Sequence, residues 1–527
     1  MKRGFLLPSL LGLGLLTTAA LGGGAAAATK HRTIGQPQVG VYVSASEIMV
    51  GWDPSTDFSN EIIAMNNMYE TLLRYNPVNG KFTDVLATSY SSSPNHLTWT
   101  FHIRKGVYFH SGDLMTAADV KASIERTIQL GQGASYIWGA VKSISVPNEW
   151  TVVFQLKYPS PLNLIAASPY GSFIFDTKIL KQKGQNWFNQ QHEDGTGPYE
   201  MQSYSGGTLV LKAFPKYWGG WKGQHFQKVI FENVNQDSTR AQMIESGQAD
   251  YVDVLSTSDF SSMKNNPNVR IDVTPSFQDL IGFFNTQQAP FTNVKVRQAL
   301  FDTYPGEQVV SDVMHGMATV SHGPVPVGLW GHDASLPAAA VPNLAQAKRL
   351  LAEAGYAKGF TTTLTYTAGD QNEANAAALW AAEAAKVGVH IKVQGMPWTS
   401  QWSLAKSPSP SRRQGIFLMY WWPDYTSPYS FLYNMFHSEK TINFNMSYFY
   451  NSQVDHYIDQ GNIAAGVSIK KGTADFQKAQ QLIMAAYPVV PMFDEKYERA
   501  ISSHLVGFVD NPSYPNVVFW YNVHERG

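Results

Sequence analysis

The sequence of 527 residues contains no cysteine. Disulfide bonds, cysteine nucleophiles and a lipid-anchored cysteine at a mature N-terminus are therefore excluded. At the start of the chain two basic residues precede an apolar stretch over 5–21, and small residues follow at 25–28. That order predicts a cleavable secretory signal peptide over 1–28. An exported chain without a lipid anchor is expected in the periplasm of a Gram-negative cell.

The chain also lacks a large excess of either positive or negative charge. Lysine and arginine number 39 against 40 aspartates and glutamates, which gives a formal net charge of −1. Loss of residues 1–28 removes two basic residues and no acidic one, so the mature charge becomes −3. This balance gives no support for a nucleic-acid partner. No later segment reaches the roughly 18 uninterrupted apolar residues of a membrane helix, so the mature protein is expected to be soluble.

Sequence motifs of common enzymes are absent as well. There is no Gly-x-Ser-x-Gly elbow and no His-Glu-x-x-His helix. His192, Glu193 and Asp194 are adjacent, but consecutive side chains of an extended loop diverge and do not form a compact set of metal ligands. We therefore expect no catalytic residue, no metal site and no cofactor.

Aromatic residues are abundant, at 13% of the chain with 14 tryptophans. They exceed what a core usually requires, and aromatic walls suit a cleft that stacks on a ligand. For any single tryptophan, a place in a large aromatic core is the alternative. About 500 mature residues are too many for one core and predict two or more lobes.

One stretch shows clear local patterns. From Leu97 to Arg104 apolar and polar residues alternate, which predicts a half-buried strand. Thr116 precedes Asp119 by three residues, the spacing of a capping box at a helix start. Apolar residues at four-residue spacing then predict one buried helix face: Val120, Ile124 and Ile128. We expect the polar residues of this stretch to be structural and not catalytic, namely His102, His110 and Asp113.

The same stretch, from Asn67 to Leu130, resembles the signature region of the family 5 extracellular solute-binding proteins, which carry peptides and related solutes to ABC importers. The matching elements are Tyr69–Leu72, Leu86–Tyr90, Trp99–Gly112 and Thr116–Val120. Further matches follow at Gly195–Glu200, Arg240–Asp250, Ile281–Leu300 and Pro488–Phe493. The chain departs from the family pattern after Leu300, where Pro305 would interrupt a helix.

The resemblance implies an α/β fold of the type II periplasmic binding protein class. Two large lobes would be joined by a hinge, and an extra small lobe would be added. The expected boundaries are 29–70, 196–284 and 493–527 for the first large lobe, 71–195 for the small lobe and 285–492 for the second large lobe. By pattern alone, the second large lobe contains a βαβ unit made of a strand at 360–366, a helix at 372–387 and a strand at 389–393.

The resemblance also implies a ligand-binding residue. Oligopeptide- and dipeptide-binding members carry an aspartate, in a segment like Met419–Phe431, that receives the α-ammonium group of the ligand. The matching residue here is Asp424, with Pro428 fixing the register. A carboxylate buried when a cleft closes must be paired, and a ligand amine supplies the missing charge. The alternative interpretation is that Asp424 caps a helix or a turn.

Aromatic residues near Asp424 are expected to form the walls of the pocket. They are Tyr420, Trp421 and Trp422, together with Trp398 and Trp402 from the preceding cleft-forming segment of the family. Some of them must be core residues, because alternate residues of a strand face opposite sides. Arg412 and Arg413 are candidates for a ligand carboxylate only because they are near in sequence, and the 407–413 loop is expected to lie solvated at the surface.

The resemblance implies the periplasmic substrate-binding component of an ABC importer. Such a protein captures peptides or similar small amine-bearing solutes in a cleft between lobes and delivers them to a membrane permease and its ATPase. We expect a monomer that is not an enzyme. Binding of an oligosaccharide, an opine or a metal chelate remains an alternative, as does a role as a periplasmic chaperone or sensor.

Overall fold

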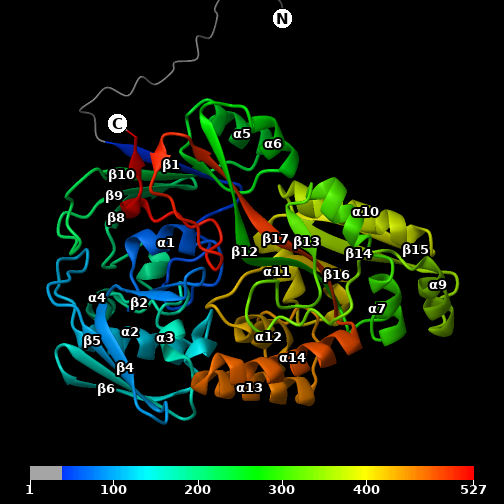
Figure 1. Cartoon of the computed structure of the whole chain (residues 1–527), viewed down its shortest axis with the longest axis horizontal. Coiled ribbons are helices and arrows are strands. Elements are labelled where there is room, and N and C mark those ends of the chain that lie inside the picture. The colour runs from blue at the N-terminus through cyan, green and yellow to red at the C-terminus, as the bar shows by residue number, and fades with distance from the viewer. Residues whose placement is uncertain (1–37, 527) are drawn as a thin grey trace, which may run out of the picture. The chain divides into compact units, whose positions relative to one another are not determined.

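The computed structural model describes residues 38–526 (Figure 1). The predicted signal peptide therefore lies outside the described residues. Across the described range, no helix combines the length and the apolar character needed to cross a membrane.

A mixed sheet of eleven strands organises this part of the chain. Its order is β15 (Val389–Met396), β14 (Phe360–Thr367), β16 (Ile416–Trp421), β12 (Val269–Phe284), β17 (Val489–Ser502), β11 (Tyr251–Val252), β1 (Val39–Ser44), β10 (Lys228–Asn233), β9 (Thr208–Ala213) and β8 (Tyr199–Ser205), while β13 (Ala318–Val320) also pairs with β17.

The two long central strands connect the halves of this sheet. β12 and β17 run antiparallel from the pair Val269↔Ser502 to the pair Phe283↔Val489. At one end β12 pairs with β16, and at the other end β17 pairs with β11 (Figure 1). Both strands are longer than the sequence pattern indicates, because polar residues inside them, such as Glu495, interrupt the apolar run.

The half of the sheet that includes β14 contains the predicted βαβ unit. β14 and β15 pair in parallel, and α10 (Gln371–Ala385) connects them. Asp370 caps α10 by accepting a hydrogen bond from the Glu373 N–H. After the helix, Gly388 takes a φ of 88°, a left-handed conformation that suits glycine. This unit is thus confirmed, with bounds shifted by one to three residues.

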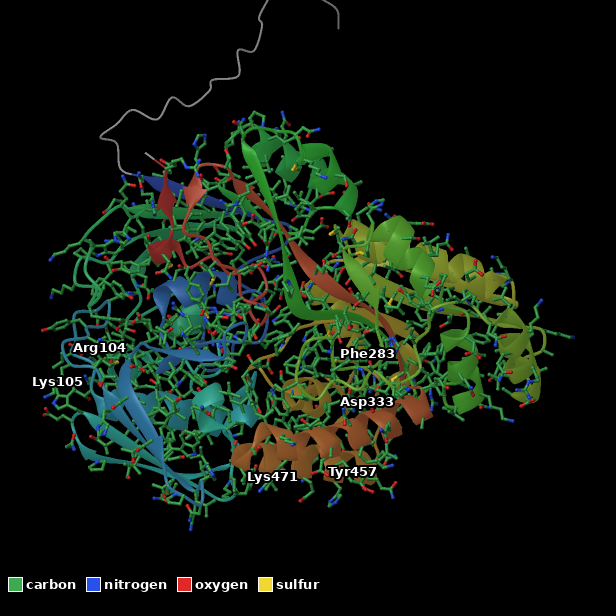
Figure 2. All side chains as sticks on the ribbon, viewed as in Figure 1. Arg104, Lys105, Phe283, Asp333, Tyr457 and Lys471 are labelled. Carbon is green, nitrogen blue, oxygen red and sulfur yellow. The ribbon has the colours of Figure 1, made fainter. Side chains whose placement is uncertain are left out.

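In the other half of the sheet, β1 lies between β10 and β11 and is parallel to both. Aromatic side chains fill the core here, where Tyr42 stacks on Tyr251 with ring centroids 4.9 Å apart. Buried residues also form the core around the central strands, and Figure 2 places fully buried Phe283 inside while exposed Lys105 and Lys471 lie at the periphery.

A separate sheet of four strands contains the stretch with the clearest sequence patterns. Its order is β4 (Ala87–Ser92), β5 (Thr98–Ile103), β7 (Thr151–Leu156) and β6 (Val141–Asn148). The predicted strand is β5, and the predicted capping box of Thr116 and Asp119 begins α2 (Ala117–Leu130). The prediction for Ile128 is wrong, since its side chain is 39% exposed. Four-residue steps advance about 40° around a helix each time, so Ile128 has rotated off the face of Val120.

Close packing explains why glycine stands at two positions of the Gly195–Glu200 segment. Neither Gly195 nor Gly197 has a positive φ. A Cβ on Gly195 would lie 2.1 Å from the Met68 carbonyl oxygen, and one on Gly197 would lie 2.5 Å from that of Asn67. The absence of a side chain therefore lets this segment pack against the end of α1 (Ile62–Met68).

Residues 38–526 contain further β-strands and α-helices. They are the paired strands β2 (Leu73–Asn76) with β3 (Lys81–Asp84) and β18 (Leu505–Val506) with β19 (His524–Glu525), and the helices α3 (Leu162–Ile165), α4 (Thr177–Lys183), α5 (Asp237–Glu245), α6 (Thr257–Met263), α7 (Val294–Phe301), α8 (Gly306–Gln308), α9 (Leu344–Glu353), α11 (Trp398–Ala405), α12 (Pro428–Phe436), α13 (Ser452–Val467) and α14 (Ile469–Ala486). The chain breaks between α7 and α8 at Pro305, as predicted. The three lobe boundaries stay a prediction.

Candidate functional site

A cavity of about 180 Å³ opens where strands of both halves of the main sheet end. Its lining includes residues that directly follow the carboxyl ends of β1, β14 and β16, among them Ala45, Ala368 and Trp422. In open α/β sheets, the carboxyl ends of parallel strands are where ligands bind. The topology therefore marks this cavity as the candidate ligand site.

The carboxylate of Asp424 lies in the wall of this cavity and is only 8% exposed. Its Oδ2 accepts hydrogen bonds from the Tyr136 hydroxyl at 2.6 Å and from the Asn434 side-chain amide at 2.8 Å. Its own backbone N–H donates to the Ser430 hydroxyl. Ser427, and not Asp424, caps the following helix α12. The interpretation of Asp424 as a helix cap is therefore not supported.

Burial dominates the electrostatics of Asp424. It raises the pKa of this carboxyl group to about 6, although hydrogen bonds from Tyr136 and Asn434 act in the opposite direction. Within residues 38–526, no lysine, arginine or histidine forms an ion pair with Asp424. A buried carboxylate without a cationic partner is costly, and a cation entering the cavity would supply the missing charge.

Tryptophan side chains form one wall of the cavity. Trp398 and Trp402 are spaced by four residues on α11, so they share a helix face, and their ring centroids lie 5.2 Å apart. Phe58 stacks on Trp402 at 6.0 Å, and Phe444 packs against Trp402 at 5.5 Å. Offset aromatic pairs of this kind make a rigid apolar surface.

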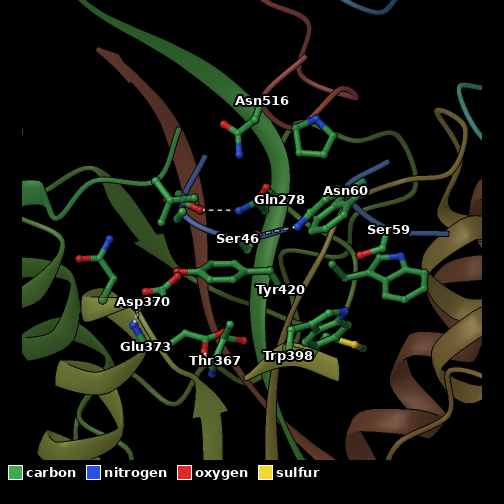
Figure 3. A pocket seen from close by; sticks show the side chains of 18 of the residues that line it. Ser46, Ser59, Asn60, Gln278, Thr367, Asp370, Glu373, Trp398, Tyr420 and Asn516 are labelled. Atoms are coloured by element: carbon green, nitrogen blue, oxygen red, sulfur yellow. Dashed lines mark hydrogen bonds between the residues drawn. The ribbon is translucent and has the colours of Figure 1, made fainter. Parts of the chain in front are cut away.

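The other three predicted aromatic residues also line the cavity. Figure 3 shows Tyr420 within the cavity, with its hydroxyl end toward Asp370. Trp421 is only 7% exposed and packs edge-on against Phe444, so it belongs largely to the core. The Trp422 ring N–H donates to the Tyr170 hydroxyl at 2.8 Å. The structure thus brings all six predicted residues to one cavity, and their contact with a ligand stays a prediction.

Arg412 and Arg413 are not among the described residues that line the cavity. Arg413 is 7% exposed, donates hydrogen bonds to the Ser407 carbonyl and the Gln287 side chain, and lies 4.1 Å from the centre of the Tyr448 ring. The prediction of a solvated loop is therefore wrong for Arg413. A short helical turn at 410–412 directs it inward, and the local sequence of serines and prolines carries no signal of that burial.

Several charged residues of the lining were missed at the sequence level. They are Asp370, Glu373, Glu495, Glu498 and Arg499. Asp370 follows the predicted strand at 360–366. It could have been predicted as a site residue, because ligands bind at the carboxyl ends of parallel strands. The glutamates lie on β17 beyond the predicted strand end and gave no such signal. Arg499 is already paired with Asp510 at 2.9 Å, and both side chains are buried.

Comparisons with known proteins agree with this architecture. The family model of the bacterial extracellular solute-binding proteins, family 5 middle region, matches residues 81–443. The chain is 27% identical over 464 residues to the probable D,D-dipeptide-binding periplasmic protein DdpA of Escherichia coli, covering 85% of this chain and 87% of that protein. It is 28% identical over 437 residues to the glutathione-binding protein GsiB of Shigella flexneri, covering 81% and 83%.

A solved structure shows the same fold. The periplasmic binding protein DppA of Helicobacter pylori, in complex with the peptide STSA, superposes with a TM-score of 0.82 at 22% identity, over 92% of this chain and 98% of that one. This likeness confirms the predicted α/β fold of the type II periplasmic binding proteins. Since the family model covers most of the chain, the protein belongs to the family 5 bacterial extracellular solute-binding proteins.

Proposed function

We propose that this protein is the periplasmic binding component of an ABC importer and that it captures peptides or similar small amine-bearing solutes in the cavity. The observation that carries the proposal is the Asp424 carboxylate, which is 92% buried in the cavity wall and has no cationic partner in residues 38–526. The ammonium group of a ligand would form the ion pair that the protein itself does not supply.

The size of the cavity suits a small solute. At roughly 15 Å³ for each water-sized group, 180 Å³ accommodates on the order of a dozen such groups. A dipeptide with small side chains has about that many non-hydrogen atoms. The aromatic wall of Trp398, Trp402 and Phe58 would contact its apolar parts.

Relatives favour a peptide over the other ligand classes. DdpA is named for D,D-dipeptides and GsiB for glutathione, and the compared DppA structure holds a peptide. An oligosaccharide, an opine, a metal chelate and a chaperone or sensor role are not favoured by these relatives. Within residues 38–526, no group of three or more histidine, aspartate or glutamate side chains has the arrangement of a metal site.

The mode of action follows from the family. Its members are solute-binding transport proteins, so we assign this chain no catalysis. The protein would be exported by the signal peptide at 1–28, without a lipid anchor, and would act as a monomer. Closure of lobes bounded as predicted would bend β12 and β17 and present the loaded form to a permease and its ATPase.

Ligand release tests this function directly. The mature protein is purified from its native periplasm and denatured, and the released small molecules are identified by mass spectrometry. Tight ligands dissociate slowly and survive purification. Peptides or other amine-bearing solutes in the released fraction support the proposal, whereas a neutral sugar or a metal chelate contradicts it.

A further inference from the structure

One side of the cavity has an excess of carboxyl groups. Besides Asp424, the lining contains four acidic residues on two elements: Asp370 and Glu373 at the start of α10, and Glu495 and Glu498 on β17. Among the described lining residues, Arg499 is the one with a positive charge. The wall that a ligand meets is therefore strongly acidic.

Within residues 38–526, no direct ion pair with a lysine, arginine or histidine holds these four carboxyl groups. The charge of Arg499 nevertheless acts on Glu495, and that of Arg240 acts on Asp370. The Arg499 guanidinium is held by Asp510 at 2.9 Å and by Asn516, and it lies 3.7 Å above the centre of the Tyr497 ring. Its charge is thus already paired.

Helix capping accounts for only part of this cluster. Asp370 caps α10, and a Glu373 oxygen accepts the Thr367 N–H at 2.5 Å. The Glu495 carboxylate, by contrast, accepts a single recorded hydrogen bond, from the Gln278 side chain at 2.7 Å (Figure 3). The hydrogen bond from Gln278 does not require a charged group at position 495, because the side-chain oxygen of a neutral glutamine would also accept it.

An unpartnered hydroxyl group lies beside the cluster. Tyr497 is two residues from Glu495 on β17, so both side chains lie on the same face of the strand. Tyr497 lines the cavity and is 3% exposed, and its hydroxyl group has no hydrogen-bond partner among the described residues. Buried hydroxyl groups are normally hydrogen-bonded, so the Tyr497 hydroxyl would accept a bond from a donor that reached it.

The acidic groups also act on one another. Burial and the neighbouring Asp370 raise the pKa of Glu495 to about 8. Burial and Asp370 likewise raise the pKa of Glu373 well above its ordinary value. Burial and mutual repulsion thus favour the protonated forms of Glu495 and Glu373, against the opposing charge of Arg499 at Glu495, and a bound cation would favour release of these protons.

We infer that Glu495, Asp370 and Tyr497 form a subsite for a second cationic group of the solute. The inference rests on the proposed function and narrows it. The ligand would be a peptide or peptide-like molecule whose α-ammonium group binds at Asp424 and whose lysine-like or arginine-like side chain binds at the acidic side of the cavity. Two charged ends bound at two carboxylate sites would fix the orientation of the solute.

Matched dipeptides test the subsite. Calorimetry at pH 7 compares Lys-Ala with norleucine-Ala and Ala-Lys with Ala-norleucine, because norleucine keeps the unbranched carbon chain of lysine and lacks its charged ammonium group. In one of the two pairs, the wild-type protein should bind the lysine peptide at least tenfold more tightly and release more protons to the buffer. In Glu495→Gln the preference should fall below threefold. Glu383→Gln, at a surface pair with Lys386, should leave the preference unchanged.

The outcomes separate the inference from the proposed function. Equal affinity for lysine and norleucine peptides in the wild-type protein, together with weaker binding of both by Asp424→Asn, overturns the acidic subsite and keeps the function. A lysine preference that persists in Glu495→Gln and in Asp370→Asn/Glu495→Gln also overturns the subsite. Failure of all four peptides to bind overturns both. Thermal unfolding of each variant shows that it is folded.

Discussion

The Tyr136 hydroxyl group donates a 2.6 Å hydrogen bond to Oδ2 of Asp424, although 288 residues separate the two in sequence. Tyr136 belongs to the predicted small lobe and Asp424 to the predicted second large lobe. The bond therefore connects distant parts of the chain at the cavity wall, and Asn434 donates to the same oxygen. Together these two donors orient the carboxylate and favour its charged form.

Tyr136→Phe tests this hydrogen bond. Loss of the donor leaves the carboxylate less stabilised as an anion, so an amine-bearing dipeptide should bind about fivefold more weakly, or about 1 kcal/mol. Calorimetry measures the change. Tyr433 stacks on Tyr136 with ring centroids 4.9 Å apart, and no hydrogen bond of its hydroxyl group is recorded in residues 38–526, so Tyr433→Phe is the matched control. Equal affinities of the two variants would contradict the proposed role.

Glu495→Gln should change stability in a pH-dependent way. The pKa of Glu495 is raised from 4.5 to about 8 in the folded protein, so the native state binds more protons than the unfolded state between these values. Its contribution to stability therefore falls as the pH rises from 4.5 to 8. The ligand-free variant should unfold at higher temperature than the wild type at pH 9, with a gain of at least about 1.4 kcal/mol, the equivalent of one pKa unit.

The same comparison at pH 4.5 should show little difference, since Glu495 is then protonated in the folded state. Glu353 is the control, because its pKa is lowered by its surface pair with Lys295. Glu353→Gln should give no stabilisation at pH 9. A Glu495→Gln variant as stable as the wild type at both pH values would show that the Glu495 carboxyl group is not desolvated.

Gly195→Ala tests the close packing of the chain against the end of α1. A Cβ there would lie 2.1 Å from the Met68 carbonyl oxygen, so the backbone must move. We expect the free energy of unfolding to fall by about 1–3 kcal/mol, the usual cost of overpacking. At Gly51 the nearest atom would be 3.7 Å away, and Gly51→Ala should change the free energy by less than about 0.5 kcal/mol. Denaturant unfolding measures both, and equal effects would refute the explanation.

Asp510→Asn tests whether Arg499 serves the fold or the ligand. Both side chains of the Arg499–Asp510 pair are buried, at 3% and 5% exposure. Breaking the pair leaves a buried guanidinium without its partner and should cost about 3–5 kcal/mol of unfolding free energy. If Arg499 instead awaited a ligand carboxylate, Asp510→Asn would leave stability nearly unchanged and strengthen the binding of anionic peptides. Denaturant unfolding and calorimetry distinguish these cases.

Local patterns in the sequence predicted much of the fold. The alternation in β5, the capping box of α2 and the parallel pairing of β14 with β15 all depend on neighbouring residues, and all are present. The prediction that Ile128 is buried was wrong, because residues spaced by exactly four positions shift progressively around a helix. The prediction that Arg413 is solvated was wrong, because its burial depends on Tyr448 and Gln287, which are far away in sequence.

Only part of the candidate site could be predicted from the sequence. Asp424 and the aromatic wall were found from one segment and its resemblance to a family. The acidic side was missed because Asp370 and Glu495 are 125 positions apart and meet only when β14, β16, β12 and β17 pair side by side in the sheet. Glu495 also lies in a polar part of β17 that does not resemble a buried strand.

Binding of a free and an N-acetylated form of the same dipeptide to wild-type protein and Asp424→Asn tests the central claim most directly. Calorimetry should show that Asp424→Asn weakens binding of the free amine by at least about 1.5 kcal/mol, the lower range for a hydrogen bond to a charged group. The acetylated peptide should bind both proteins equally weakly. Unchanged affinity of Asp424→Asn for the free amine would contradict the account and remove Asp424 from the site.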